Sequence, residues 1–363
     1  MLLDPFFAST YGQAREQFLR GALAAGAGTE HLVHPYATGA EGEELAIDLA
    51  YLGRADARAL LVVTSGTHGV EGFCGSGFQV AFLADRALQD QCRGARVAVL
   101  LVHAVNPHGF SHMRRVNEDN VDLNRNFRDF TKPLPDNGVY AELHPHILPQ
   151  TWPPPAASEA VLGAFIARHG IAGLQAAISA GQYRFPDGLF YGGDQPTWSN
   201  RCMRALLARH GAPRRRLAWI DFHSGLGPQG HAEKIYAGHD DPVELARARA
   251  WWGAEVTSFH NGSSVSPALT GAMYVAAYEE CPHLEYTGIA LEFGTIALQD
   301  VFGALRADQW LHNHPDAPLP PGAAVAAAMR QAFDGGTAEW HAQVLRQGRD
   351  AVAAAIANLR CHD

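Results

Sequence analysis

The chain has 363 residues, of which 47% are hydrophobic and 18% charged, and its formal net charge is −9. This composition is that of a globular protein with a large core, and the length allows one large domain or two ordinary ones. The acidic balance argues against a nucleic-acid-binding surface. The one notable basic run, Arg214-Arg215-Arg216, follows Pro213 and is interpreted as a solvated turn rather than a phosphate-binding patch.

The N-terminal segment Met1–Phe7 has no basic stretch, no long apolar core and no small-residue cleavage site, so it does not have the pattern of a secretory signal. No run of 18 apolar residues predicts a membrane span. The five cysteines are widely spaced and include no Cys-x-x-Cys pair, which is typical of reduced thiols. We therefore expect a cytoplasmic protein without a membrane partner.

Strands and helices alternate along the chain. Four short apolar runs predict buried strands at 59–64, 97–104, 217–223 and 288–293. Helical patterns lie at 75–88, 157–169, 197–210 and 241–253, and two more follow at 322–334 and 337–359. Proline-rich stretches at 131–155 and 311–321 predict long surface loops.

This alternation predicts an α/β fold with a mixed, mostly parallel central sheet and helices on both faces. The ionisable residues at the strand ends are scattered from position 68 to 292, which favours a single catalytic domain over residues 1–363. The C-terminal helices, about 322–359, are expected to pack on that domain.

The first predicted strand ends in a glycine-flanked turn that contains His68-x-x-Glu71. An imidazole and a carboxylate at this spacing can converge on one ion, and Zn²⁺ accepts both ligand types. A pair of this kind is weak by itself, because a surface histidine beside a solvated glutamate gives the same pattern.

The other predicted strands also end in polar residues. His103 closes the second strand, Asp221 and His223 end the third, and Glu292 lies within the fourth. Because sites in open α/β sheets form at the carboxyl ends of strands, these side chains are expected to lie near the His68 turn.

The order of these pieces resembles the zinc carboxypeptidase (M14-like) metallopeptidase family. The resemblance rests on His68-x-x-Glu71, an Asn106-Pro107-x-Gly segment followed by arginine, and the block Asp122-Leu123-Asn124-Arg125-Asn126, with a later histidine and glutamate, over residues 59–295. The opening Asp4–Phe7 resembles a little-characterised bacterial branch (DUF2817-like).

The resemblance implies one Zn²⁺ per chain, held by His68, Glu71 and His223, with a position left open for water. It also implies that Glu292 serves as general base and acid toward water activated by the metal.

The remaining roles are implied by the same resemblance. Arg115, rather than its neighbour Arg114, would stabilise the oxyanion of the tetrahedral intermediate. Asn124 and Arg125 would bind the terminal carboxylate of the substrate, and Asp122 would orient His68. The family also uses a tyrosine before the catalytic glutamate; Tyr274 is favoured, while Tyr278 and Tyr286 stay open.

Together these features predict a zinc-dependent hydrolase of the metallocarboxypeptidase type, a protease that cleaves a peptide-like amide bond next to a free carboxylate. An alternative is an N-acyl amino acid deacylase of the aspartoacylase or succinylglutamate desuccinylase type. A third reading, a non-catalytic ligand-binding relative, would be favoured if a ligand or Glu292 were missing. The expected substrate is a small peptide or an N-acyl amino acid.

Overall fold

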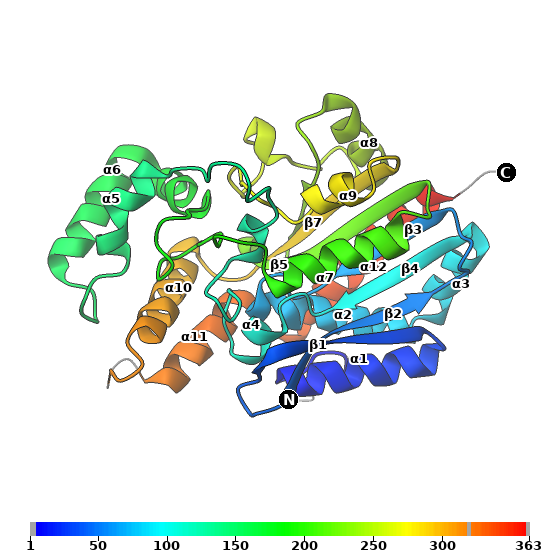
Figure 1. The fold of residues 1–363 in the computed structure, drawn as a ribbon, viewed down its shortest axis with the longest axis horizontal. Helices are drawn as coiled ribbons and strands as arrows, with labels where there is room; N and C mark the ends of the chain where they lie inside the picture. The colour runs from blue at the N-terminus through cyan, green and yellow to red at the C-terminus, as the bar shows by residue number, and fades with distance from the viewer. Residues whose placement is uncertain (1–4, 318–320, 361–363) are drawn as a thin grey trace.

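The computed structural model describes residues 5–317 and 321–360, and one mixed sheet organises this part of the chain (Figure 1). The strands follow in the spatial order β1-β2-β4-β3-β5-β7-β6. Strands β4, β3, β5 and β7 pair in parallel, whereas β1, β2 and β6 pair antiparallel at the edges. The predicted α/β class is confirmed. The strands are β1 (Gly28–Thr38), β2 (Glu44–Leu52), β3 (Ala59–Thr64), β4 (Val97–His103), β5 (Arg216–Gln229), β6 (Ala232–Tyr236) and β7 (Glu285–Gly294).

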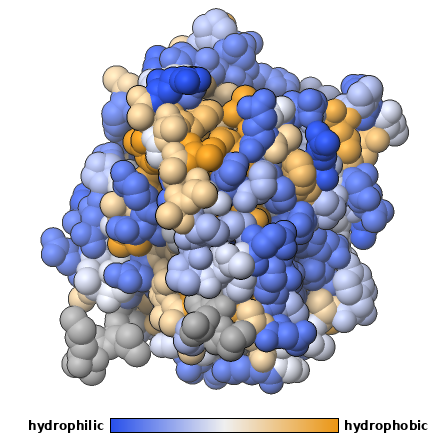
Figure 2. Space-filling view, turned by 90° about the vertical axis from the view of Figure 1, so that its left-hand side faces the viewer, coloured by the Kyte–Doolittle hydropathy of each residue, from blue (hydrophilic) through white to orange (hydrophobic). Residues whose placement is uncertain are grey.

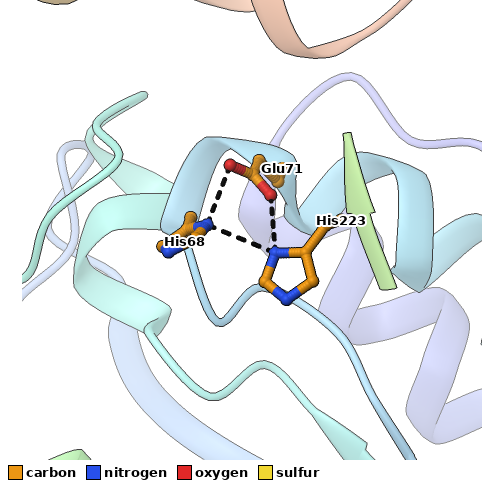
Figure 3. A group of neighbouring side chains, drawn as sticks. All are labelled: His68, Glu71 and His223. Atoms are coloured by element: carbon orange, nitrogen blue, oxygen red, sulfur yellow. Dashed lines mark hydrogen bonds and ion pairs between the residues drawn. The ribbon is translucent and has the colours of Figure 1, made fainter. Parts of the chain in front are cut away.

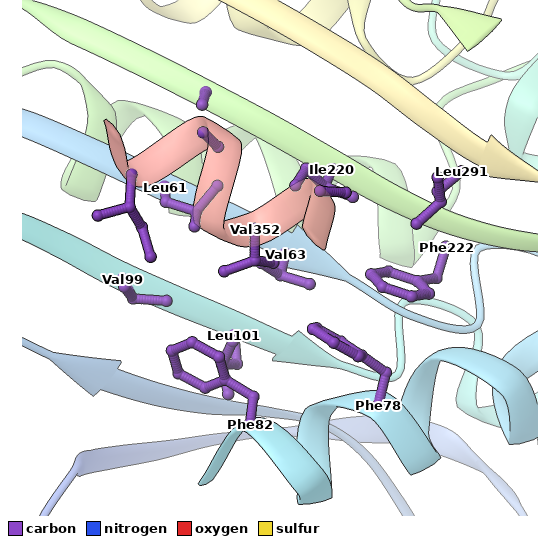
Figure 4. Close-up of a cluster of buried hydrophobic side chains, with 14 of the residues drawn as sticks. Leu61, Val63, Phe78, Phe82, Val99, Leu101, Ile220, Phe222, Leu291 and Val352 are labelled. Atoms are coloured by element: carbon purple, nitrogen blue, oxygen red, sulfur yellow. The ribbon is translucent and has the colours of Figure 1, made fainter. Parts of the chain in front are cut away.

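Helices cover both faces of the sheet, which explains why the central strands are continuously apolar. All residues of β3 and β4 are buried. One face packs against α1 (Tyr11–Ala25), α2 (Gly72–Ala84), α3 (Arg86–Ala95), α8 (Pro242–Trp252) and α12 (Ala338–Leu359). The other face packs against α7 (Trp198–Leu206), the π-helical segment Leu207–Gly211 and α9 (Val275–Glu280). Figure 4 shows Phe78 and Phe82 of α2 and Val352 of α12 against the first face.

Four further helices form a separate cluster, which we call the helical lobe, beyond the carboxyl ends of the central strands (Figure 1). They are α5 (Gly138–Ile147), α6 (Ala156–Ser179), α10 (Leu298–Asn313) and α11 (Gly322–Phe333). The lobe has its own apolar core, which includes Leu174 of α6, Val301 of α10 and Met329 of α11. This lobe therefore overhangs the edge of the sheet at which a site is expected.

Helix α6 exposes much of its apolar surface. Its most apolar 18-residue window has a mean hydropathy of 1.4 and is 17% buried, so by length and composition this one described helix could cross a membrane. A single helix of this kind carries little weight. Figure 2 shows the side of the molecule that faces left in Figure 1, where apolar surface lies among hydrophilic side chains.

Several predicted boundaries need correction. The predicted helix 75–88 covers most of α2 and the start of α3. The two helices are separated at Asp85, whose side chain accepts a hydrogen bond from the Leu88 N–H and begins α3. The predicted loop 131–155 contains α5, which begins where the Asn137 side chain accepts from the Tyr140 N–H. The predicted loop 311–321 starts inside α10, and its residues 318–320 lie outside the described residues.

The predicted strands 59–64, 97–104, 217–223 and 288–293 correspond to β3, β4, β5 and β7. Strands β1, β2 and β6 were not predicted. β1 is largely exposed and β6 has five residues, so neither gives the long apolar run that marks a central strand. β2 is apolar apart from a few positions. Most of its residues are buried whichever face of the sheet they are on, so apolar and polar residues do not alternate along it.

The sheet core makes a quantitative prediction. Phe78 is 2% exposed and stacks on Phe222 with ring centroids 4.6 Å apart. Phe78→Ala should lower the free energy of unfolding by about 3–5 kcal/mol, because a large cavity opens in a packed interior. Leu23→Ala is the control, since Leu23 is 79% exposed. Urea denaturation measures both, and similar losses for the two variants would contradict this account of the core.

Candidate metal centre and active site

The candidate site lies at the carboxyl ends of β3, β5 and β7. After β3 ends at Thr64, the chain turns through Gly66 (φ 64°) to His68, and the 3₁₀ helix Gly69–Glu71 leads into α2. A Cβ atom on Gly69 would lie 2.1 Å from the Gly109 carbonyl carbon of α4 (Pro107–Ser111), so only glycine allows this close approach. The packing of the turn on α4 thereby fixes His68 and Glu71.

Three side chains converge at this edge (Figure 3). The ligand atoms of His68, Glu71 and His223 all lie within 4.8 Å of one another, and all three residues are buried. His68 Nδ1 lies 2.9 Å from Glu71 Oε1, and His223 Nδ1 lies 3.0 Å from Glu71 Oε2. The two Nδ1 atoms are 3.2 Å apart. Two imidazole nitrogens and a carboxylate thus face one common point.

The far nitrogen of each imidazole faces a carboxylate. His223 Nε2 lies 2.7 Å from Asp221 Oδ2, and His68 Nε2 lies 3.1 Å from Asp122 Oδ1. An Nε2–H that donates to a carboxylate leaves Nδ1 with a lone pair toward the cluster, which is the tautomer that a metal ligand requires. The sequence left the role of Asp221 open; its position two residues before His223 on the same strand puts both side chains on one face.

Arg115 also reaches the cluster. Its Nη1 donates to Glu71 Oε1 at 2.8 Å and its Nε donates to Asp122 Oδ2 at 3.1 Å. Its Nη2 lies 2.8 Å from His68 Nε2, an atom that cannot both accept from Arg115 and donate to Asp122. Metal ligation by His68 Nδ1 therefore requires the bond to Asp122 and a retreat of the guanidinium. Arg114 points elsewhere and donates to Asp308 of α10 at 3.0 Å.

The charged groups of this site shift the pKa values of Glu71 and His223. Burial by itself would raise the pKa of Glu71, but His68, His223 and Arg115 outweigh it and hold that pKa below its usual value. Burial would lower the pKa of His223, yet the Asp221 and Glu71 carboxylates raise it well above the usual range. A cation that binds here must therefore displace a proton from His223.

Glu292 lies beside the cluster on β7, directly opposite His223 in the parallel register of β5 and β7. Its Oε1 accepts a hydrogen bond from the Leu226 N–H at 3.0 Å. Burial, together with the negative charge of Glu71, raises the pKa of Glu292 to about 8. A divalent cation held by His68, Glu71 and His223 would lower that pKa, because it would reverse the local charge.

The two residues predicted to bind a carboxylate have different surroundings. The Arg125 guanidinium is buried; its Nε and Nη2 donate to the Ser179 carbonyl and its Nη1 to the Asn124 carbonyl. Burial and the charge of Arg115 lower the pKa of Arg125. The Asn124 side-chain oxygen accepts from the Met273 N–H at 2.9 Å.

Tyr274 lies at the start of α9, and burial raises the pKa of its hydroxyl to about 12. It lines the same cavity as the cluster, of about 150 Å³, as do Glu292, Arg115, Asn124 and Arg125. Every predicted site residue except Asp122 thus lines one cavity, and Asp122 contacts His68 Nε2. The roles assigned to these residues stay predictions.

Sequence reasoning missed Phe190 and the apolar wall of the cavity. The Phe190 ring lies 5.4 Å from the Arg115 guanidinium carbon and 5.6 Å from that of Arg125, so it contacts both cations. Leu174 and Ile178 of α6 and Val301 of α10 form part of the cavity wall. No motif signals these positions; a non-glycine residue at φ 54° marks Phe190 only once the backbone is known.

The donor set fits a metal ion. Two imidazole nitrogens and one carboxylate are a ligand set of catalytic zinc sites, which take three protein ligands and leave a further position open. The paired Nδ1 atoms at 3.2 Å also suit a shared cation better than two N–H groups, which would repel each other.

Comparison with solved structures places the fold. Thrombin activatable fibrinolysis inhibitor (TAFI) superposes with a TM-score of 0.52 at 12% identity, covering 98% of this chain and 80% of that one. Carboxypeptidase A from Helicoverpa armigera gives a TM-score of 0.49 at 13% identity, with 95% and 74% covered. A metallo-carboxypeptidase from Pseudomonas aeruginosa gives 0.43 at 16% identity, with 95% and 68% covered. The chain has the fold of thrombin activatable fibrinolysis inhibitor.

No curated protein sequence is significantly similar to the chain. One family model matches residues 7–347, which is nearly the whole chain. Its description is "Protein of unknown function (DUF2817)". The chain therefore belongs to the DUF2817 family.

Proposed function

We infer that the protein is a zinc-dependent hydrolase of the metallocarboxypeptidase type, which cleaves a peptide-like amide bond next to a free carboxylate. The observation that carries this proposal is the convergence of His68, Glu71 and His223 in the cavity that also holds Glu292 and Arg125. Metal ligands, a proton acceptor and a carboxylate-binding group are thus available in one place.

Each group has a defined task in amide hydrolysis. Bound Zn²⁺ would polarise the substrate carbonyl and make water a better nucleophile. Glu292 would take a proton from the attacking water as oxygen adds to the carbonyl carbon, and would deliver it to the nitrogen as the C–N bond breaks. Arg115 would meet the negative charge that develops on the carbonyl oxygen, because a guanidinium stays charged throughout.

Arg125 keeps donors for a substrate carboxylate. Its bonds to Ser179 and Asn124 leave N–H groups on both Nη1 and Nη2, and two parallel N–H groups can bind a carboxylate in bidentate fashion. The nearest countercharge is Asp122, at 3.9 Å, which is already shared with Arg115. A substrate carboxylate would therefore compensate a buried positive charge.

The position of the helical lobe favours a small substrate over a large one. Because α6 and α10 contribute walls to the cavity, the space on that side of the cluster is bounded. This bounded space favours a small substrate such as a dipeptide or an N-acyl amino acid, so an N-acyl amino acid deacylase is the second candidate. Parallel assays of dipeptides and N-acyl amino acids on the same zinc-loaded preparation separate the two activities.

The first prediction concerns the metal. Protein loaded with Zn²⁺ and dialysed should keep about one ion per chain, while His68→Ala and His223→Ala should lose it, because two ligands rarely hold zinc. The matched control is His169→Ala, an exposed histidine of α6. Metal analysis after dialysis provides the test, and full occupancy in both cluster variants would refute the ligand assignment.

The second prediction separates binding from chemistry. Glu292→Gln should keep the metal and lower kcat roughly 10²–10⁴-fold, because it removes the proton acceptor and leaves the ligands in place. Glu285→Gln, on the same strand but with a side chain 43% exposed, should leave kcat unchanged. Turnover near the parent level in Glu292→Gln would assign proton transfer to another group.

The third prediction concerns the carboxylate. Amidating the terminal carboxylate of the best substrate should lower kcat/KM, since a charged hydrogen bond contributes about 1.5–3 kcal/mol, or roughly ten- to a hundredfold in rate constant. Arg125→Ala should lower activity on the acid and largely remove the difference between acid and amide. Arg128→Ala, three positions away and outside the cavity, should preserve that difference.

A thermal melt must first show that Arg125→Ala folds, because Arg125 also donates to Ser179. If the parent enzyme hydrolyses acid and amide equally well, the function is that of a general amidase and the carboxypeptidase proposal fails.

A further inference from the structure

A second cavity, of about 1310 Å³, lies at the opposite edge of the sheet, where the central parallel strands begin. Seven arginines line it, and Asp56 is the one acidic residue among its lining residues. The arginines are Arg54, Arg58, Arg93, Arg96, Arg215, Arg216 and Arg360. This accumulation of positive charge is unexpected in a chain whose net charge is −9.

The sheet topology places three of these arginines at the starts of neighbouring strands. Arg96, Arg58 and Arg215 each immediately precede the first residue of β4, β3 and β5, which are neighbours in that order. The register aligns these starts, because Ala59 pairs with Val97 on one side and with Arg216 on the other. Adjacent strands lie about 4.8 Å apart, so the backbones of these three arginines lie next to one another at the start of the sheet.

Hydrogen bonds to backbone carbonyl groups hold the arginine segments of this cavity in place. The Arg58 carbonyl accepts from the Arg215 N–H at 2.8 Å and from the Arg216 N–H at 3.2 Å. Arg214, which is buried, donates through Nη1 to the carbonyl groups of Ala55 and Ala57. All three residues of the Arg214–Arg216 run are thus anchored to the 54–58 segment before any ligand binds.

Only part of this positive charge is compensated. Arg54 pairs with Asp56, Arg93 with Asp90, and Arg216 with Glu285. In residues 5–317 and 321–360, no ion pair with an acid is found for Arg58, Arg215 or Arg360. Like charges on neighbouring strands are destabilising, so the arrangement is one that an anion would stabilise.

We propose that this arginine-lined cavity binds a small anion that carries several phosphate groups, an oligophosphate of the kind found in nucleoside di- and triphosphates. Guanidinium groups bind phosphate oxygens in bidentate fashion, and seven arginines line this one cavity. A small ligand is favoured over a nucleic acid, because the net charge of −9 opposes a long polyanion. The cavity lies at the amino ends of strands whose carboxyl ends form the candidate active site, so the proposal does not depend on the proposed hydrolase activity.

The experiment titrates the full chain with inorganic triphosphate at about physiological ionic strength, with binding measured by calorimetry. Arg58→Gln/Arg215→Gln should weaken binding roughly a hundredfold, because each lost charged hydrogen bond costs about tenfold or more. Arg20→Gln/Arg168→Gln, which changes two exposed arginines outside this cavity and removes the same charge, should bind like the parent. Without triphosphate, the double variant should unfold at the parent temperature or above it, since repulsion is relieved.

Three results would overturn the proposal. One is equal triphosphate affinity in the parent and the double variant, which would place any binding elsewhere, including at the candidate metal centre. Another is tighter binding of citrate than of triphosphate, which would make the ligand a polycarboxylate. The third is a short oligothymidylate that binds more tightly than triphosphate and loses that affinity in the double variant, which would make the cavity a nucleic-acid site.

Discussion

The parallel register of β3, β5 and β7 is the constraint on which the candidate active site depends. It pairs Thr64 with Asp221 and His223 with Glu292, so residues separated by more than 200 positions end at one edge. A shift of one residue would turn His223 and Glu292 toward opposite faces, because side chains alternate along a strand. The apolar residues that bury both faces of β3 therefore also determine the chemistry, since they fix its position between β4 and β5.

The site concentrates ionisable groups that a protein interior tolerates only when they compensate one another. Glu71 and Asp122 share Arg115, and Asp122 also faces His68. Glu292 is buried and accepts a hydrogen bond from a backbone N–H; burial, and then the repulsion of Glu71, raises its pKa to about 8. Among these groups, Glu292 lacks a full countercharge, whereas Glu71 faces both Nδ1 atoms and Arg115. A divalent cation would supply it, which connects the electrostatics of the cluster to the chemistry proposed for it.

The sequence predicted the four central parallel strands and the polar residues at their ends, because both leave local patterns, but it missed β2. It could not predict β1 and β6, which are an exposed edge strand and a strand of five residues. It also missed α5, whose signal was hidden by flanking prolines and by Pro145 within it. Phe190 and the walls formed by α6 and α10 depend on tertiary packing alone, so no spacing along the chain reveals them.

The same register that gathers ligands at one edge of the sheet gathers arginines at the other. At the carboxyl ends, His223 and Glu292 lie on paired strands; at the amino ends, Arg58 and Arg215 precede paired strands. From the sequence, Arg214–Arg216 was interpreted as a solvated turn, because a run of three charges carries no information about its neighbours. The fold changes that interpretation, since it buries Arg214 as an anchor and places Arg215 beside arginines more than 100 residues away. A parallel sheet thus brings charged residues that are scattered along the chain together at each of its two edges.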